Sequence, residues 1–212
     1  KIDPHTGGAI PFFHGEDLIK LIPEAGRMCE LEILNFGNYP GPHITPELML
    51  ELSFLVRETS ERDDINGIIV THGTDTLEET AYFLDLNVDT EKPVVIIGAM
   101  KTSTEKDWDG PRNLIDAIQI ISNINSKGMG VLVCLNGEIN AASEVTKTHT
   151  EELETFHSLD FGALGFVEKG RVIYNRIPRK QEKLLTDTIN SNVDLITTYT
   201  GMSEKFLRYS AD

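Results

Sequence analysis

The sequence predicts an α/β protein: an open, mostly parallel β-sheet with helices on both faces, plus a β-hairpin, followed by the beginning of a second α/β domain. Three short apolar runs at residues 67–70, 93–97 and 130–135 have the length and composition of strands buried on both faces. Segments with helical spacing of apolar residues separate these runs. Strands that alternate with helices favour parallel pairing, with helices covering both faces of the sheet.

The first part of the chain supplies two helices and one strand before the first buried run. A short helix is expected over residues 18–22, ending near Pro23. The alternation of polar and apolar residues at 30–34 predicts a strand. Thr45 as the N-cap and Pro46 in the first turn then begin a long helix, whose apolar residues follow at helical spacing.

The helix after the first buried run has a start signal of its own. Thr76 and Glu79 have the spacing of a capping box, in which each side chain bonds the other residue's backbone amide. Leu77, Ala81 and Leu84 then share one helical face. Capping alone would explain this pattern without any functional role.

Later segments predict one more helix and a hairpin. Apolar residues from Leu114 to Ile124 recur at helical spacing, and the helix is expected to end before Lys127. Residues 161–167 and 171–174 read as two strands around a Glu-Lys-Gly turn, which is typical of a β-hairpin.

The composition of the chain changes after the hairpin. We expect an N-terminal domain at residues 1–178 and a polar linker at 179–192. Residues 193–212 would begin a second domain, with a strand at 193–199 and a helix starting after Ser203. No internal repeat is visible.

Charge and hydropathy restrict the partners. The 212 residues carry a net charge of −15, which repels phosphate backbones and argues against a nucleic-acid partner. No apolar run approaches the roughly 20 residues that span a bilayer, so no membrane partner is expected. No signal-peptide pattern is visible at the N-terminus. These features favour a cytoplasmic protein.

Metal and redox chemistry have little support. The two cysteines, Cys29 and Cys134, lie far apart in apolar contexts and form no CxxC, so reduced thiols are expected rather than a disulfide or a zinc site. The histidines His43, His72 and His149 lack the spacing of metal ligands. We expect no metal and no cofactor.

Three loops should meet at one edge of the sheet, because ligands of open parallel sheets bind beyond the carboxyl ends of the strands. These loops are residues 71–76, 98–103 and 136–150. The sequence contains no GxSxG, GxGxxG or GxxxxGK[ST] motif, so an α/β-hydrolase triad, a dinucleotide site and a P-loop lack support. The residue types in these loops then favour a site in which a threonine hydroxyl is the nucleophile and a lysine takes its proton. As an alternative, Asp75 simply stabilises a helix N-terminus and Lys147 lies on the surface.

At this point several stretches match a known pattern. THGTDTLEETAYFLDL (71–86), GAMKTSTEKDWDGPRNLIDAI (98–118) and EVTKTHTEELETFHSLDFGALG (144–165) resemble, in the correct order, signature segments of bacterial L-asparaginases. Residues 7–24 and 44–52 also fit. The resemblance, closest to the cytoplasmic type, covers nearly the whole chain.

The resemblance implies a two-domain α/β enzyme that hydrolyses L-asparagine to L-aspartate and ammonia. The reaction would pass through an acyl-enzyme on a threonine and need no cofactor. The family implies a small-molecule substrate, L-asparagine or alternatively L-glutamine. It also implies assembly as a homodimer or homotetramer.

The resemblance also assigns residues. Thr74, Asp75 and Lys147 would be catalytic: Thr74 acts on the attacking water or leaving group, and Lys147 sets the proton affinity of the hydroxyl. Asp75 would in addition hold the substrate's α-ammonium. The substrate would be bound by Gly41, Pro42, Gly73, Thr74, Asp75 and Ala99, with the backbone of Ala99 receiving the amide.

Two departures from the family pattern stand out. Thr6 and the glycines after it imitate the family's nucleophile motif, but the residues that follow match the segment after the nucleophile loop. The acylated threonine is therefore expected upstream of Lys1, and residues 1–212 alone are expected to be inactive. Second, Gly41 and Pro42 fall where the family commonly binds the substrate carboxylate with a serine.

Two other functions stay open. One is a non-catalytic protein that binds amino acids on the same scaffold. The other is the asparaginase-like amidase subunit of a tRNA amidotransferase, whose RNA partner suits the negative charge poorly.

Overall fold

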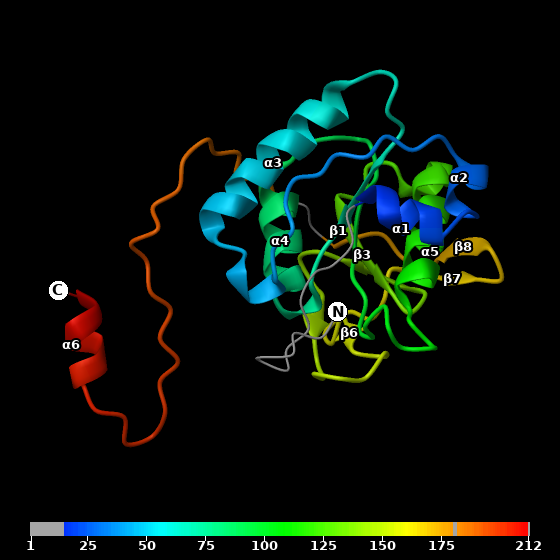
Figure 1. Ribbon diagram of the computed structural model, residues 1–212. Helices are drawn as coiled ribbons and strands as arrows, with labels where there is room; N and C mark the ends of the chain where they lie inside the picture. Colours follow the sequence, from blue (N-terminus) through cyan, green and yellow to red (C-terminus); the bar gives the residue numbers. More distant parts are fainter. Residues whose placement is uncertain (1–14, 180–181, 212) are drawn as a thin grey trace.

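A six-stranded sheet forms the centre of the protein, in the strand order β1-β2-β3-β4-β7-β8 (Figure 1). The computed structural model describes residues 15–179 and 182–211. Strands β1 (Ile68–Thr71), β2 (Val94–Ile97) and β3 (Val131–Leu135) pair in parallel and correspond to the three predicted runs, each beginning one residue later than predicted. Strands β4 (Glu138–Ala141), β7 (Gly165–Glu168) and β8 (Arg171–Tyr174) extend the sheet in antiparallel fashion. The predicted α/β class is confirmed.

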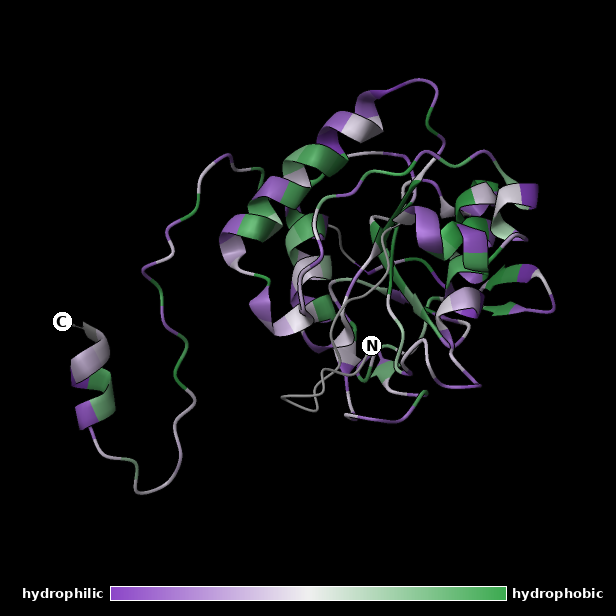
Figure 2. Ribbon diagram, viewed as in Figure 1, coloured by the Kyte–Doolittle hydropathy of each residue, from purple (hydrophilic) through white to green (hydrophobic). Residues whose placement is uncertain are grey.

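Helices cover both faces of the sheet, as predicted. Helices α3 (Pro46–Glu61) and α4 (Leu77–Asn87) pack on one face, and α5 (Gly110–Ser122) lies on the other beside α1 (Gly15–Leu21) and α2 (Ala25–Met28). Hydrophobic residues accordingly concentrate on the strands and on the inward helix faces (Figure 2). Because alternate strand residues face opposite sides, Val95 and Leu132 belong to one core while Ile96 and Val133 belong to the other.

Most predicted helices are confirmed. The Thr45 side chain caps α3 by accepting a hydrogen bond from the Leu48 amide at 3.4 Å. Helix α1 ends at Leu21, and α5 ends at Ser122 before a short 3-10 helix, η3 (Ile124–Ser126). The helix predicted after Ser203 is α6 (Lys205–Ala211).

Two predicted strands are wrong. Residues 30–34 and 193–199 form no strand, although their patterns favoured one. The first segment has no hydrogen-bonded neighbour in the described sheet. In the second, Leu195 is 97% exposed, so its apolar residues have no surface to pack against. A strand pattern gives a strand only where a partner edge is available.

The third predicted loop, residues 136–150, contains regular structure that the sequence pattern did not lead us to expect. Asn136 (φ 51°) and Gly137 (φ 79°) form a two-residue turn that joins β3 to β4. Two successive positive φ values are typical of the hairpin turn that Asn-Gly favours, so the Asn-Gly pair was a sequence signal for the β3–β4 hairpin.

The hairpin predicted at residues 161–174 is confirmed as the pair β7–β8, but its first strand begins at Gly165 rather than Phe161.

The C-terminal segment leaves the body of the protein after β8. Residues 183–187 run along α3 and α4, where the Leu184 amide bonds the Leu86 carbonyl at 2.8 Å and Arg57 pairs with Asp187 at 2.9 Å. The chain then extends away to α6, which Figure 1 shows apart from the sheet. The division into a domain at 1–178, a linker and a second domain remains a prediction.

Two further sequence predictions can be compared with the structure. Cys134 is buried and Cys29 half-buried, and both are free thiols as expected. Burial raises the pKa of each thiol, which favours its protonated form. Among the described residues, no helix is long and apolar enough to cross a membrane.

Candidate active site

The loop that follows β1 lies at the carboxyl edge of the parallel strands. The His72 amide continues the β1–β2 pairing by bonding the Ile97 carbonyl at 2.9 Å. The chain then turns through a 3-10 helix, η2 (Thr74–Thr76), directly into α4. Thr74 and Asp75 are therefore held between a strand end and a helix start, where sheets of this kind place ligands.

Lys147 reaches this loop from a separate two-stranded sheet, in which β5 (Thr146–Lys147) pairs with β6 (Phe156–His157). Its Nζ donates to the Thr74 hydroxyl oxygen at 3.0 Å and to the Asp75 carboxylate at 2.9 Å. The Lys147 side chain is 13% exposed and that of Asp75 61%. The ammonium is thus largely withdrawn from water, while the carboxylate remains open to a ligand.

The predicted capping box at Thr76 is wrong. Thr76 makes no side-chain cap, and its hydroxyl instead donates to the Gly41 carbonyl at 2.6 Å. This bond fixes the 3-10 helix η1 (Gly41–His43) against the loop at residues 71–76. Gly41 and Gly73 meet so closely that a Cβ on Gly73 would lie 3.0 Å from the Gly41 backbone. The structure thus brings Gly41 and Gly73 together, with exposed Pro42 next to them.

The loop after β2 carries Ala99 and is fixed by two side chains that the sequence pattern did not single out. The Asp109 carboxylate accepts hydrogen bonds from the amides of Met100 and Lys101, each at 3.0 Å. Asn113 donates to the Gly98 carbonyl at 2.9 Å. Asp109 and Asn113 both lie within segment 98–118, whose resemblance to the family was the feature of the sequence that could have pointed to them.

Gly98 allows this loop to approach the loop at residues 71–76. A Cβ there would lie 2.9 Å from the Thr74 methyl carbon and 2.9 Å from the His72 carbonyl oxygen. Any larger residue would push the Ala99 backbone away from Thr74.

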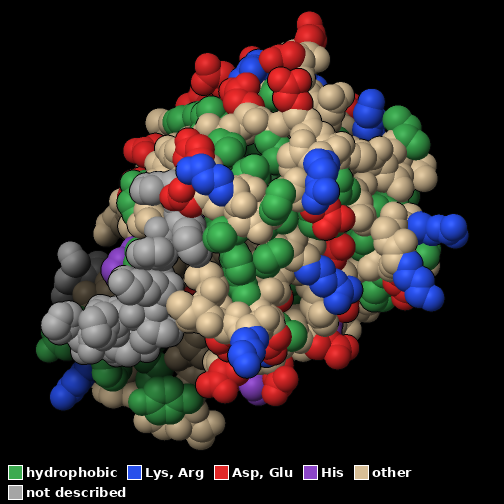
Figure 3. Space-filling view, turned by 45° about the vertical axis from the view of Figure 1, so that its right-hand side comes forward, with side chains coloured by type: hydrophobic (Ala, Val, Ile, Leu, Met, Phe, Trp, Pro, Cys, Tyr) green, Lys and Arg blue, Asp and Glu red, His purple; other side chains and the backbone are tan. Residues whose placement is uncertain are grey.

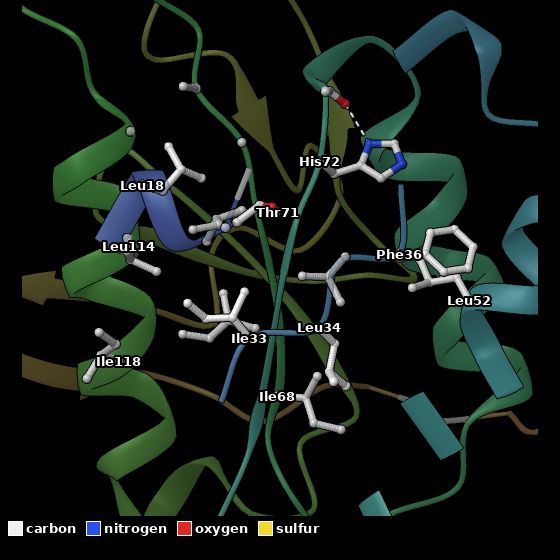
Figure 4. A pocket seen from close by; sticks show the side chains of 18 of the residues that line it. Leu18, Ile33, Leu34, Phe36, Leu52, Ile68, Thr71, His72, Leu114 and Ile118 are labelled. Carbon is white, nitrogen blue, oxygen red and sulfur yellow. Dashed lines mark hydrogen bonds between the residues drawn. The ribbon is translucent and has the colours of Figure 1, made fainter. Parts of the chain in front are cut away.

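His72 stabilises the turn from inside the protein. Its Nδ1 lies 2.7 Å from the Gly73 carbonyl, drawn as a dashed line in Figure 4, and its Nε2 lies 2.9 Å from the Thr80 hydroxyl. A carbonyl only accepts, so Nδ1 carries the proton and Nε2 accepts from Thr80. Burial lowers the pKa of His72, although the bond to Gly73 acts in the opposite direction. The neutral ring is therefore favoured.

A large cleft of about 1510 Å³ adjoins the site, and Thr74, Asp75, Ala99 and Lys147 are among the residues that line it. Polar and apolar side chains line the rest, and the apolar ones include Ile33 and Leu34 of the extended segment, Ile68 of β1, Leu52 of α3, and Leu114 and Ile118 of α5 (Figure 4). On the outer surface, hydrophobic side chains gather in the middle of one face between charged ones (Figure 3).

The cleft borders the edge of the sheet at β1. Among the described strands β1 is terminal, and its three apolar residues are only partly buried, whereas β2 is buried throughout. Ile68 and His72 direct their amides to β2, so the alternate residues Ile69 and Thr71 direct their backbone groups the other way.

The described residues do not gather metal ligands. Within residues 15–179 and 182–211 there is no group of three or more His, Cys, Asp or Glu side chains that could hold a metal ion. His43, His72 and His149 belong to separate parts of the site region, and His149 is used to bond the amides of Glu151 and Glu152.

Comparison with known proteins decides the family. The sequence profile described as "Asparaginase, N-terminal" matches residues 1–180. The chain belongs to the asparaginase family. The resemblance found in the sequence motifs is thereby confirmed.

Individual relatives agree with this assignment. "Probable L-asparaginase periplasmic" of Haemophilus influenzae is 40% identical over 171 residues, or 81% of this chain and 48% of the relative. "Glutaminase-asparaginase" of Pseudomonas aeruginosa is 40% identical over 191 residues, or 90% of this chain and 50% of the relative. The chain thus spans about half the length of the curated relatives it matches.

A solved structure is similar throughout the fold. The structure titled "Probable Cytoplasmic L-asparaginase from Campylobacter jejuni" superposes with a TM-score of 0.88 at 32% identity. The match covers 94% of this chain and 65% of that one.

Proposed function

We propose that the full-length protein hydrolyses the side-chain amide of L-asparagine, giving L-aspartate and ammonia. The observation that carries this proposal is the contact of the Lys147 ammonium with both the Thr74 hydroxyl and the Asp75 carboxylate, at 3.0 and 2.9 Å. A threonine hydroxyl needs a neighbouring group that can take its proton, and Lys147 is placed to do so. The names of the similar proteins support the same reaction.

The proposed chemistry has two steps. The oxygen of the attacking threonine bonds the amide carbon, its hydroxyl proton passes by way of the Thr74 hydroxyl to the amide nitrogen, and the C–N bond breaks to release ammonia. Water then attacks the acyl ester, its proton passes by the same route to the threonine oxygen, and L-aspartate and the free threonine are released. In both steps Lys147, after losing one proton to solvent, would accept the Thr74 hydroxyl proton while Thr74 takes the proton of the nucleophile, and would return it as Thr74 protonates the leaving group.

We propose that the acylated threonine enters on a strand added to the open edge of β1. The cleft supports this, because within residues 15–179 and 182–211 no strand pairs with the outward-facing backbone groups of Ile69 and Thr71, and α3 and α5 provide apolar walls. A strand with apolar residues on both faces would bury these walls, and its carboxyl end would lie at the rim occupied by Thr74 and Lys147. Thr6, the alternative nucleophile considered in the sequence, lies outside the described residues.

We propose that the substrate lies between the three loops. The exposed carboxylate of Asp75 would bind the α-ammonium, and the backbone of Ala99 would receive the amide. Gly41, Pro42 and Gly73 would offer backbone groups to the α-carboxylate. A site that recognises both charged groups of an amino acid accepts L-asparagine, and a longer cavity would admit L-glutamine as well.

The experiment is ammonia release from L-asparagine by the full-length protein and by its Lys147→Met variant. We expect turnover in the first and at least a hundredfold loss in the second, the usual size for removal of a proton-transfer group. Lys106→Met, which removes an exposed lysine from the neighbouring loop, serves as the control and should be as active as the wild type. Equal turnover in the wild type and in Lys147→Met would contradict the assigned role.

The alternative of a non-catalytic amino-acid-binding protein has its own outcome. Calorimetry that shows L-aspartate or L-asparagine binding without ammonia release would favour it. An amidotransferase subunit would instead need RNA, and the net charge of −15 argues against that partner.

Assembly and location are also proposals. We propose a homodimer or homotetramer in the cytoplasm, consistent with free thiols at Cys29 and Cys134. The names of similar proteins include both a periplasmic and a cytoplasmic asparaginase. Light scattering of the full-length protein and cell fractionation test the two statements.

A further inference from the structure

The position of Lys147 relative to the catalytic loop depends on one carboxylate. Lys147 lies on a two-residue strand that belongs to a small sheet separate from the six-stranded one. Its ammonium bonds Thr74 and Asp75, yet a long, flexible side chain keeps a single geometry only if its backbone is also held.

Glu78 provides that hold. It lies in the first turn of α4, three residues after Asp75, and is half-buried. One of its carboxylate oxygens accepts from the Thr146 hydroxyl at 3.0 Å, and the other accepts from the backbone amide of Lys147. Both oxygens therefore bond β5, at the two residues that form this strand.

We propose that Glu78 is a positioning residue that fixes the backbone of Lys147, so that its ammonium meets the Thr74 hydroxyl. The proposal rests on the function assigned above to Lys147. Within five consecutive residues, 74 to 78, three side chains bond Lys147, two at its ammonium and one at its backbone amide. The start of α4 thus holds the lysine at both ends.

A simpler explanation of Glu78 is that a carboxylate stabilises the N-terminus of α4. Glu79 allows this explanation to be tested, because it lies in the same first turn of α4 as Glu78. Its side chain is exposed, whereas that of Glu78 is half-buried. Both carboxylates gain from the helix dipole, but the hydrogen bonds to Thr146 and to the Lys147 amide are made by Glu78. Glu79→Ala therefore removes a dipole contribution and leaves the bonds to β5 in place.

Substitution by glutamine separates geometry from charge. In Glu78→Gln the amide oxygen can accept from the Lys147 backbone, and the amide NH₂ can donate to the Thr146 hydroxyl, which then accepts. The two bonds to β5 are preserved although the charge is removed. Glu78→Ala removes both bonds.

The test measures kcat and KM for L-asparagine, as a function of pH, in full-length wild type, Glu78→Ala, Glu78→Gln and Glu79→Ala. We expect kcat to fall about 10- to 100-fold in Glu78→Ala with little change in KM, because a displaced catalytic group slows the chemistry and Asp75 still binds substrate. Glu78→Gln and Glu79→Ala should retain kcat. Unchanged kcat in Glu78→Ala, or an equal loss in Glu78→Gln, would overturn the proposal.

A crystal structure of full-length Glu78→Ala gives a readout that does not need turnover. The separation of Lys147 Nζ and Thr74 Oγ1, now 3.0 Å, should exceed the hydrogen-bond limit of about 3.5 Å. If the two atoms stay within hydrogen-bond distance, Glu78 does not position the lysine. If the wild type is inactive on L-asparagine but the two atoms separate in Glu78→Ala, the proposed function is refuted and the positioning role is supported.

Discussion

The close approach of Gly73 to Gly41 gives a prediction in which only one of two neighbouring glycines tolerates a side chain. A Cβ on Gly73 would lie 3.0 Å from both Cα and N of Gly41, well inside the ordinary contact of about 3.5–4.0 Å. A Cβ on Gly41 would meet only contacts of 3.5 Å or more. Gly73 has φ −70° and ψ 141°, which alanine adopts freely, so the difference is purely steric.

The magnitude follows from two opposing terms. Overpacking against backbone costs about 1–3 kcal/mol, while replacing glycine by alanine recovers about 0.4–1 kcal/mol through the unfolded state. Gly73→Ala should therefore lose roughly 0.5–2 kcal/mol of unfolding free energy, or about 1–8 °C in melting temperature for a chain of this size. Gly41→Ala should be neutral or slightly stabilising.

Urea denaturation of the two variants measures this difference. Because the Gly41 turn must move away from Asp75 in Gly73→Ala, the affinity for L-aspartate should fall in that variant. Equal stability of Gly73→Ala and wild type, or an equal loss in Gly41→Ala, would refute the steric reasoning.

Three other predictions address single contacts. Thr76→Val should lose about 0.5–1.5 kcal/mol in urea denaturation, because the Gly41 carbonyl loses its donor; an unchanged midpoint would contradict this. Asp109→Ala should cost about 1–3 kcal/mol by leaving the Met100 and Lys101 amides without their acceptor, whereas Asp107→Ala, at an exposed ion pair with Lys101, should cost clearly less. The pKa of His72 is lower in the folded protein than in the unfolded chain. As the pH falls below about 6.5, the unfolded chain therefore binds a proton at this histidine first. The contribution of His72 to the unfolding free energy is present above that pH and is lost below it. His72→Asn should weaken this decline between about pH 7.5 and 5.5, measured by denaturation at each pH, and an identical decline in both proteins would exclude His72 as its source.

Local patterns predicted the parts of the fold that local forces determine. The apolar runs at 93–97 and 130–135 became strands because apolar side chains on both faces can be buried only inside a covered sheet, and the run at 67–70 became their partly buried neighbour. Thr45 and Pro46 began a helix because capping is decided within one turn. The pattern at 30–34 failed because pairing depends on a neighbouring edge, which the local sequence does not encode.

Some features of the candidate site could likewise be predicted from the local sequence, and others could not. The strand order placed Thr74 and Asp75 at the carboxyl edge, whereas the role of Lys147 came from the family resemblance. The bonds of Thr76 to Gly41 and of Glu78 to Lys147 join residues 35 and 69 positions apart. Such contacts depend on tertiary packing, so the sequence pattern made Thr76 a cap and gave no sign of the role of Glu78.

The central claim is that the Thr74 hydroxyl, held by Lys147, takes part in amide hydrolysis. The most direct measurement compares kcat for L-asparagine in full-length wild type, Thr74→Ser and Thr74→Val. Valine keeps the shape of threonine and removes only the hydroxyl. We predict a loss of at least about a hundredfold in Thr74→Val and substantial activity in Thr74→Ser. Equal kcat in wild type and Thr74→Val would contradict the account.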